Sequence, residues 1–147
     1  MESELSQSHY EGYVADKYLI NRKQNEIYKR LENILSGDFR ISPKIRITDL
    51  IRPDKEIIEF DPERAKHLNH KLNNARFDFV VTDLNSGKIR GVIMSRSTLT
   101  DIRAGDFIVE LLNKIKIPLF QYDEDSKISD DKLSSLLYEK FEKSNFE

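Results

Sequence analysis

The chain has 147 residues, 38% of them hydrophobic, which is enough for one domain with a single continuous core. It contains no cysteine, so disulfides, thiolate zinc sites and cysteine nucleophiles are excluded, and a cytoplasmic location is the default expectation. No stretch approaches the roughly 20 apolar residues of a membrane helix, and the first residues lack the features of a signal peptide, so we expect no membrane association.

The charges are unevenly distributed, although the net charge is only -2. Between Arg64 and Arg96, seven Lys or Arg face two acids, whereas from Asp101 to Glu147 eleven acids face seven Lys or Arg. A basic central segment suits contact with phosphate backbones, and an acidic tail suits repulsion of them or competition for the same surface. The alternative is that both segments are ordinary solvated faces.

The first elements are an arm, a helix and a strand. Residues 1–17 are polar and without a sustained period, which predicts a flexible arm. Apolar residues recur at helical spacing from Tyr18 to Leu35, and alternation from Phe39 to Ile47 predicts a half-buried strand. Pro43 places that strand at an edge or a bend. Two tyrosines of the arm are candidate anchors on the fold, Tyr10 and Tyr13.

The central elements are a helix and a hairpin. We expect a short strand or turn at Ile57–Phe60, then a helix from Pro62 to about Leu72, because Asp61 and Pro62 form a helix start. Phe77–Val81 and Ile89–Met94 read as two antiparallel strands joined by the turn-forming sequence Asn-Ser-Gly-Lys.

The last elements are two helices around a strand. Asp101 is expected to cap a helix that ends at Lys116, and Ile117–Phe120 reads as a buried strand. An acidic linker, 123–131, and an amphipathic helix over Asp130–Phe146 complete the chain. The order of elements limits the fold class to α/β or α+β.

Several segments, in this order, resemble an uncharacterised bacterial family of small nuclease-like domains in the PD-(D/E)xK superfamily, which includes restriction endonucleases. The resemblance covers about residues 20–122 and implies a restriction-endonuclease-like core with a mixed central sheet of about four strands flanked by helices. Together with the elements predicted above, this divides the chain into an arm over 1–17, a domain over 18–122, a linker over 123–131 and a terminal helix over 132–147. The matching segments are Gln24–Leu31, Ile45–Leu50, Arg76–Asp83, Gly105–Phe107 and Ile117–Leu119.

The resemblance also implies that the metal site of the superfamily has been lost. Asp78 matches the first metal ligand, but Met94 and Arg96 stand where the family carries Glu and Asp, and Gln24 stands near its helix-one glutamate. Met94 cannot bind Mg²⁺, and Arg96 brings positive charge to the place of the cation. No acid lies between Lys88 and Thr100, so a small shift in alignment does not restore the site.

The leading hypothesis is therefore an inactive nuclease-like domain without a cofactor, acting as a nucleic-acid-binding, regulatory or accessory protein in DNA processing or mobile-element biology. Its expected partner is DNA or a DNA-processing protein. An arginine in place of a cation is a suitable backbone contact. The expected nucleic-acid-binding residues are Arg76, Lys88, Arg90 and Arg96.

Two rival hypotheses belong to other classes. One is an active Mg-dependent nuclease with relocated ligands, which would combine Asp78 with Asp83, Asp101 or Glu110. The other is a protein-interaction module or homodimer that uses the terminal helix as its contact, although we expect that helix to pack on its own domain.

Two further patterns have both an ordinary and a functional interpretation. Glu63, His67 and His70 share one helical face and are weak candidates for metal ligands, but exposed polar residues on a short helix are expected anyway. The aromatic rings are expected to pack in the core in preference to stacking on bases. These rings belong to Phe77, Phe79, Phe107 and Phe120.

Overall fold

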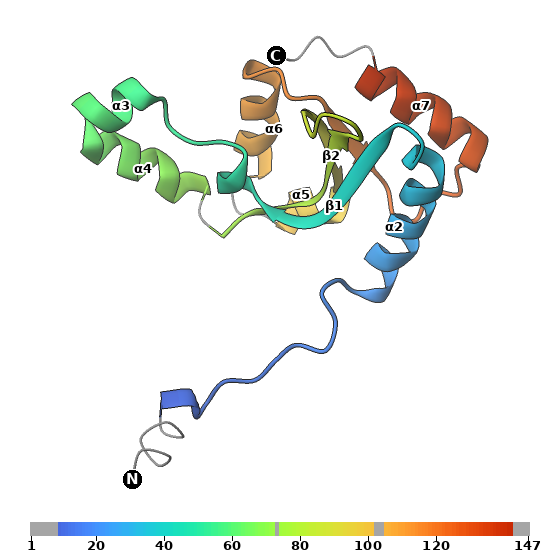
Figure 1. Cartoon of the computed structure of the whole chain (residues 1–147), viewed down its shortest axis with the longest axis horizontal. Coiled ribbons are helices and arrows are strands. Elements are labelled where there is room, and N and C mark those ends of the chain that lie inside the picture. Colours follow the sequence, from blue (N-terminus) through green and yellow to red (C-terminus); the bar gives the residue numbers. More distant parts are fainter. Residues whose placement is uncertain (1–8, 73, 102–104, 143–147) are drawn as a thin grey trace.

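The computed structural model describes residues 9–72, 74–101 and 105–142. A central sheet is flanked by helices on both faces (Figure 1), which confirms the mixed α+β class. The predicted arm and terminal helix extend at their outer ends beyond the described residues. The elements are α2 (Arg22–Leu35), β1 (Phe39–Arg46), η1 (Ile47–Asp49), α3 (Lys55–Phe60), α4 (Pro62–Leu72), β2 (Arg76–Asp83), β3 (Ile89–Ser95), α5 (Arg96–Asp101), α6 (Gly105–Lys114), β4 (Leu119–Tyr122) and α7 (Asp130–Glu142).

The sheet has four strands in the order β1-β2-β3-β4. β1 and β3 both run antiparallel to β2, whereas β4 runs parallel to β3. The expected hairpin is thus confirmed. Pro43 lies on β1, an edge strand of the sheet, as its lack of a backbone N–H predicts. A parallel neighbour requires a crossover, and the segment that contains α5 and α6 supplies it.

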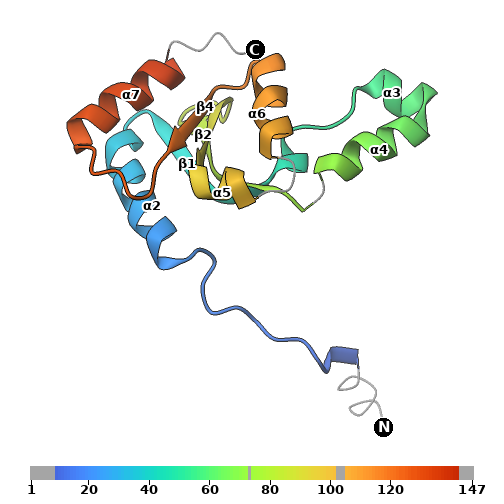
Figure 2. The same cartoon turned by 180° about the vertical axis from the view of Figure 1, so that it is seen from behind.

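Each face of the sheet carries its own hydrophobic cluster, and the two views of the fold show which helices cover them (Figures 1 and 2). On one face α2 and α7 lie side by side and bury Leu35, Leu137 and Phe141, which we call the α2/α7 cluster. On the other face α6 buries Ile108 and Leu112 against η1 and the strands, which we call the α6 cluster. The terminal helix therefore packs on its own domain, as its apolar stripe predicts.

The first helix begins at Arg22, four residues after the predicted start. Asn21 caps it: the side-chain Oδ1 of Asn21 accepts a hydrogen bond from the backbone N–H of Gln24 (2.8 Å). Residues 11–21 precede it as a largely extended arm that leads away from the body (Figure 1). Tyr10 and Tyr13 are 73% and 80% exposed, so the expectation that they anchor the arm is wrong.

Ile57–Phe60 is helical, not a strand or turn, because Asp54 caps α3 by accepting from the N–H of Glu56 (3.0 Å). α3 and α4 together form a hairpin of helices that projects sideways from the sheet (Figure 1). Its tip exposes Phe60 at 78%. The end of α4, at His70 and Lys71, lines a pocket that is also lined by α6.

The segment after β3 also differs from expectation. Asp101 ends α5, so it does not cap the following helix, and α6 begins at Gly105. Ile102, the expected first apolar residue of that helix, lies outside the described residues. β4 covers Leu119–Tyr122, two residues later than predicted, whereas α7 begins at Asp130, the predicted start of the terminal helix.

Candidate functional site

Asp78 of β2 is a buried carboxylate, only 7% exposed. Its Oδ2 accepts a hydrogen bond from the backbone N–H of Ser95 (2.7 Å), and the hydroxyl of Thr98 lies 2.9 Å from both of its oxygens. A buried charge requires such partners, because an unpaired one costs several kcal/mol, about 3–5. Asp78 is therefore the centre of a preorganised polar cluster inside an otherwise apolar sheet.

A helix cap brings Ser95 and Thr98 together at Asp78. Ser95 ends β3 and precedes α5, and its Oγ accepts from the N–H of Thr98 (3.0 Å), as an N-cap serine does three residues before its donor. This places Thr98 at the carboxylate. Neither residue was among our candidates, yet Ser-x-x-Thr directly after an apolar run is a readable capping signal.

Gln24 comes to Asp78 from the opposite direction. It lies in the first turn of α2, and its Nε2 is 3.4 Å from Oδ1 of Asp78, a long hydrogen bond. The resemblance puts Gln24 and Asp78 in one site, and the fold brings them together. The N-terminus of α2, which carries partial positive charge, therefore faces this end of the sheet.

Burial is the main electrostatic effect on this cluster. It raises the pKa of Asp78, while the hydrogen bonds from Ser95 and Thr98 lower it and the charge of Glu124 raises it further. Burial, with the charges of Asp78 and Glu124, also raises the pKa of Tyr122 well above its ordinary value. Tyr122 and Glu124 are thus additional members of the site; Tyr122 ends β4, beyond the predicted strand Ile117–Phe120, and Glu124 lies in the predicted linker.

Met94 does not share the Asp78 side of the sheet. Phe79 pairs with Ile93, so Asp78 is level with Met94, but Met94 is fully buried in the α6 cluster. The carboxylate turns toward α2 because the β1–β2 pairing is irregular here. Pro43 pairs with Phe79 and Ile45 with Phe77, which leaves the intervening Lys44, at φ 56°, without a pairing in the register.

We expected Arg96 on the returning strand, but it does not lie there. It is the first residue of α5, exposed, and just beyond the end of β3. The superfamily's arrangement, with carboxylates on adjacent strands facing one cation, is therefore not matched here. Both oxygens of Asp78 accept hydrogen bonds from protein donors, and no second carboxylate comes from β3, so this donor set does not fit Mg²⁺.

The relocated ligands of the rival hypothesis are dispersed. Asp83 lies at the far end of β2, where its Oδ2 accepts from the N–H of Ser86 (2.8 Å), and this turn lowers the pKa of Asp83. Glu110 lies on the α6 side of the sheet, and Asp101 is exposed at the end of α5. They do not assemble around Asp78.

The second predicted metal site has a similar outcome. Glu63, His67 and His70 are exposed on α4. Within residues 9–72, 74–101 and 105–142, no three His, Asp or Glu side chains converge closely enough to hold a metal ion. The ordinary interpretation of this helix face, exposed polar side chains, is the one that the geometry favours.

The four predicted basic residues form two groups at opposite ends of the sheet. Arg76 begins β2 and Arg96 follows β3, so these two lie at one end of the antiparallel pair. Lys88 and Arg90 lie at the other end, where Nη2 of Arg90 donates to the backbone carbonyl of Phe141 (3.2 Å). Arg90 therefore supports the end of α7, and the four do not make one patch.

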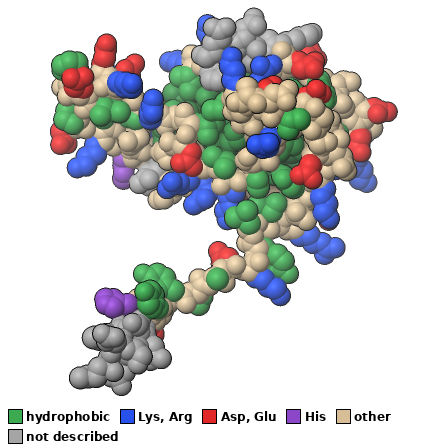
Figure 3. All heavy atoms as spheres, viewed as in Figure 1, with side chains coloured by type: hydrophobic (Ala, Val, Ile, Leu, Met, Phe, Trp, Pro, Cys, Tyr) green, Lys and Arg blue, Asp and Glu red, His purple; other side chains and the backbone are tan. Residues whose placement is uncertain are grey.

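Another arginine joins the first group. Arg46 is the direct cross-strand partner of Arg76, and both side chains are exposed. Arg46 also lies 3.4 Å from Asp49, an exposed ion pair of small energetic value. Figure 3 shows Lys and Arg side chains gathered along the lower margin of the folded body. We call Lys44, Arg46, Arg76 and Arg96 the basic strand end.

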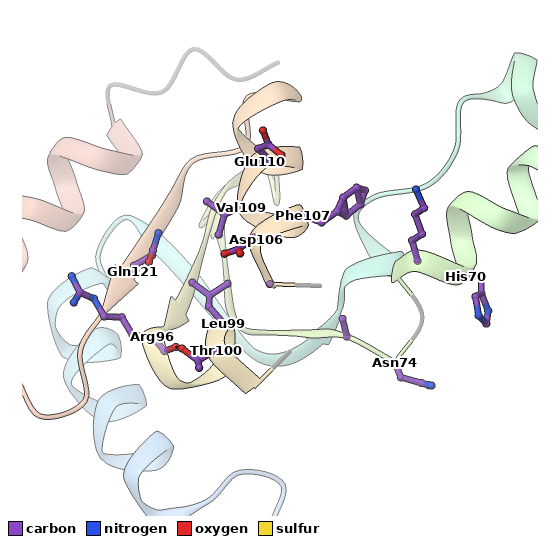
Figure 4. A pocket seen from close by; sticks show the side chains of 13 residues that line it. His70, Asn74, Arg96, Leu99, Thr100, Asp106, Phe107, Val109, Glu110 and Gln121 are labelled. Atoms are coloured by element: carbon purple, nitrogen blue, oxygen red, sulfur yellow. The ribbon is translucent and has the colours of Figure 1, made fainter. Parts of the chain in front are cut away.

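A cleft of about 1580 Å³ opens beside the basic strand end, between α4 and the helices α5 and α6. In Figure 4, Phe107 points from α6 toward α4, and Arg96 and Gln121 stand at the opposite side. The Nζ of Lys71 lies 5.4 Å from the centre of the Phe107 ring, within cation–π range. The cleft thus combines an aromatic face with polar and charged groups.

Comparison with known proteins identifies the family. No curated protein and no solved structure matches the chain. Among the described residues, none of the helices has the length and apolar character needed to cross a membrane. A family described as "Protein of unknown function (DUF2726)" matches residues 16–141, from the end of the arm almost to the end of α7. Because that match covers most of the sequence, the chain belongs to the DUF2726 family.

Proposed function

We propose that this protein is a non-catalytic, nuclease-like accessory domain that binds the phosphate backbone of nucleic acid through its basic strand end. The observation that carries the proposal is the direct pairing of Arg46 with Arg76. Like charges directly opposite each other in a sheet are destabilising. A bound phosphate removes the repulsion, because each guanidinium can donate to its oxygens.

Two neighbouring features support an anion at this place. Arg96 stands at the same end of the sheet, just after β3, and the positive end of α2 faces it. Lys44 is also exposed, although its Nζ donates to the backbone carbonyl of Leu19 (3.1 Å). These groups supply positive charge without base-specific geometry, which favours backbone contact over sequence recognition.

The test is the salt dependence of binding by the full chain. The observed affinity for a labelled 20-nucleotide duplex should fall linearly with salt on logarithmic axes. Arg46→Gln with Arg76→Gln should weaken binding and reduce the slope by about 1.8, since each lost phosphate contact to a duplex contributes about 0.9. Lys132→Gln with Lys140→Gln removes the same charge from exposed positions of α7 and serves as the control.

Two results would reject the proposal. One is a wild-type affinity that does not change with salt. The other is an Arg46/Arg76 double variant that behaves like the α7 control. Either result would show that the basic strand end does not hold phosphates.

The rival nuclease function has one supporting observation, the charge of Glu124 acting on Asp78. It predicts cleavage of plasmid or single-stranded DNA with Mg²⁺ or Mn²⁺, abolished by Asp78→Ala and by Glu124→Gln. We expect both substrates to stay intact at high protein concentration, because the donor set around Asp78 does not fit a hard cation.

A further inference from the structure

The cleft between α4 and α6 has the chemistry to hold an unpaired base, and this inference rests on the proposed function. We propose that the protein prefers single-stranded nucleic acid, with its backbone on the basic strand end and one base inserted in the cleft against Phe107. The cleft volume of about 1580 Å³ exceeds what a nucleobase needs.

The aromatic surface for that base is Phe107. Its side chain is half-buried: it packs in part against the α6 cluster and points from α6 toward α4 across the cleft (Figure 4). Phe77 and Phe79 are fully buried in the sheet, so the ring of Phe107 is the more accessible to a ligand in the cleft. Stacking on aromatic faces is the usual way in which proteins hold unpaired bases.

The polar groups of the cleft suit a base edge better than a bare phosphate. Asp106 and Glu110 of α6 line the same cleft as Asn74 and Gln121. Carboxylates accept hydrogen bonds from exocyclic amino groups, and amides can both donate to and accept from a base, but carboxylates repel phosphates. The cations Lys71 and Arg96 line the same cleft and can meet the charged backbone.

The cleft and the basic strand end are continuous. Arg96 belongs to both, and Ala75, which lines the cleft, is followed directly by Arg76. A strand whose phosphates contact Arg76 and Arg96 is therefore placed at the mouth of the cleft. A base in an intact duplex could enter only after unpairing, which disfavours duplex relative to single-stranded nucleic acid.

The experiment compares single-stranded and duplex 20-nucleotide DNA of one sequence, with the full chain and with three variants. Phe107→Leu should weaken single-strand binding roughly 5-fold or more, because one stacked base contributes about 1 kcal/mol or more, while leaving the salt slope unchanged. Phe107→Tyr, which keeps the ring, should retain the wild-type affinity. Phe120→Leu makes the same substitution on the other face of the sheet and should also retain it.

Two further measurements keep the test independent of folding. Oligonucleotides containing 5-bromouracil should photocrosslink to the peptide that contains Phe107. Asn74, exposed and at φ 67°, can be replaced by Gly without backbone strain, and Asn74→Gly should reduce discrimination among the four homopolymers. Thermal melts establish that each variant is folded.

The outcomes separate the two proposals. If the wild type binds with a normal salt slope but Phe107→Leu binds like wild type and no crosslink reaches Phe107, the cleft inference fails and the proposed function stands. If duplex binds as tightly as single strand, the preference for unpaired bases is wrong. If neither form binds in a salt-dependent way, both proposals fail.

Discussion

Gly91 of β3 lies directly against the ring of Phe141 in α7. A Cβ atom on Gly91 would stand 2.6 Å from Cδ1 of that ring and 2.8 Å from the carbonyl oxygen of Pro118. Real Cβ atoms do not approach so closely, so the absence of a side chain at Gly91 is what lets α7 dock on the sheet.

Gly91→Ala should therefore destabilise the fold by about 1–3 kcal/mol, the usual cost of overpacking a core. The measurement is the free energy of unfolding from urea denaturation. Adding Phe141→Leu should recover part of the loss, because the smaller side chain makes room for the methyl group. A Gly91→Ala variant as stable as wild type would show that α7 is held loosely.

Phe141→Ala tests whether α7 is core or interface. Phe141 is fully buried in the α2/α7 cluster, so its truncation should cost about 3–5 kcal/mol in free energy of unfolding. Leu136→Ala, at a position 38% exposed on the same helix, should cost much less. If Leu136→Ala lowers the molecular mass in solution without a change in stability, α7 has a protein partner after all.

Asp78→Asn tests the effect of burial on the carboxylate. Because burial raises the pKa of Asp78 above its ordinary 3.8, its stabilising contribution is complete below pH 3.8 and is lost as the pH rises through the folded-state pKa. Asn keeps an acceptor for the N–H of Ser95 but does not titrate. The stability of wild type relative to Asp78→Asn should thus decrease with rising pH and then level off.

The pH series of unfolding free energies has a clear contrary outcome. If the stability of wild type relative to the variant increases with pH, the hydrogen bonds from Ser95 and Thr98 outweigh burial. The pKa of Asp78 in the folded protein would then lie below its ordinary value, and the carboxylate would be charged in the native state.

Arg76→Glu should affect stability and binding in opposite directions. It replaces a like-charged cross-strand pair with Arg46 by an oppositely charged one, which should stabilise the sheet by about 0.2–1 kcal/mol. Affinity for nucleic acid should fall, since an acid now faces the phosphates. Lys132→Glu, in the first turn of α7, makes the same change of charge elsewhere and should leave affinity nearly unchanged. If Arg76→Glu is stable and binds nucleic acid with full affinity, Arg76 is not part of the binding surface.

Much of the fold is predictable because it depends on local periodicity. The apolar runs of β2 and β3, which are buried on both faces of the sheet, and the apolar stripe of α7 can all be read from the sequence. Ile57–Phe60 was misassigned because a four-residue apolar run suits both strand and helix, and the cap at Asp54 decides between them. The predicted start of the first helix at Tyr18 was too early, because the apolar residues before Asn21 fit the helical period although Asn21 is the N-cap.

The candidate site is less predictable, because it depends on how distant segments meet. The resemblance to a nuclease-like family singles out Asp78, but its contact with Thr98 requires the cap at Ser95, which follows β3. The opposite orientations of Asp78 and Met94 depend on the irregular pairing at Lys44, which no period in the sequence reveals. Charge clustering along the chain similarly joined Arg76 with Lys88, although antiparallel strands put them at opposite ends.

The same irregularity at Lys44 has a consequence for behaviour in concentrated solution. β1 is an outer strand, and outer strands offer unpaired N–H and C=O groups on which another chain can polymerise. Pro43 lacks an N–H, the next residue has a positive φ, and the cationic side chain of Lys44 must remain hydrated. A turn of backbone that aims a carboxylate inward thus also protects the protein against edge-to-edge aggregation.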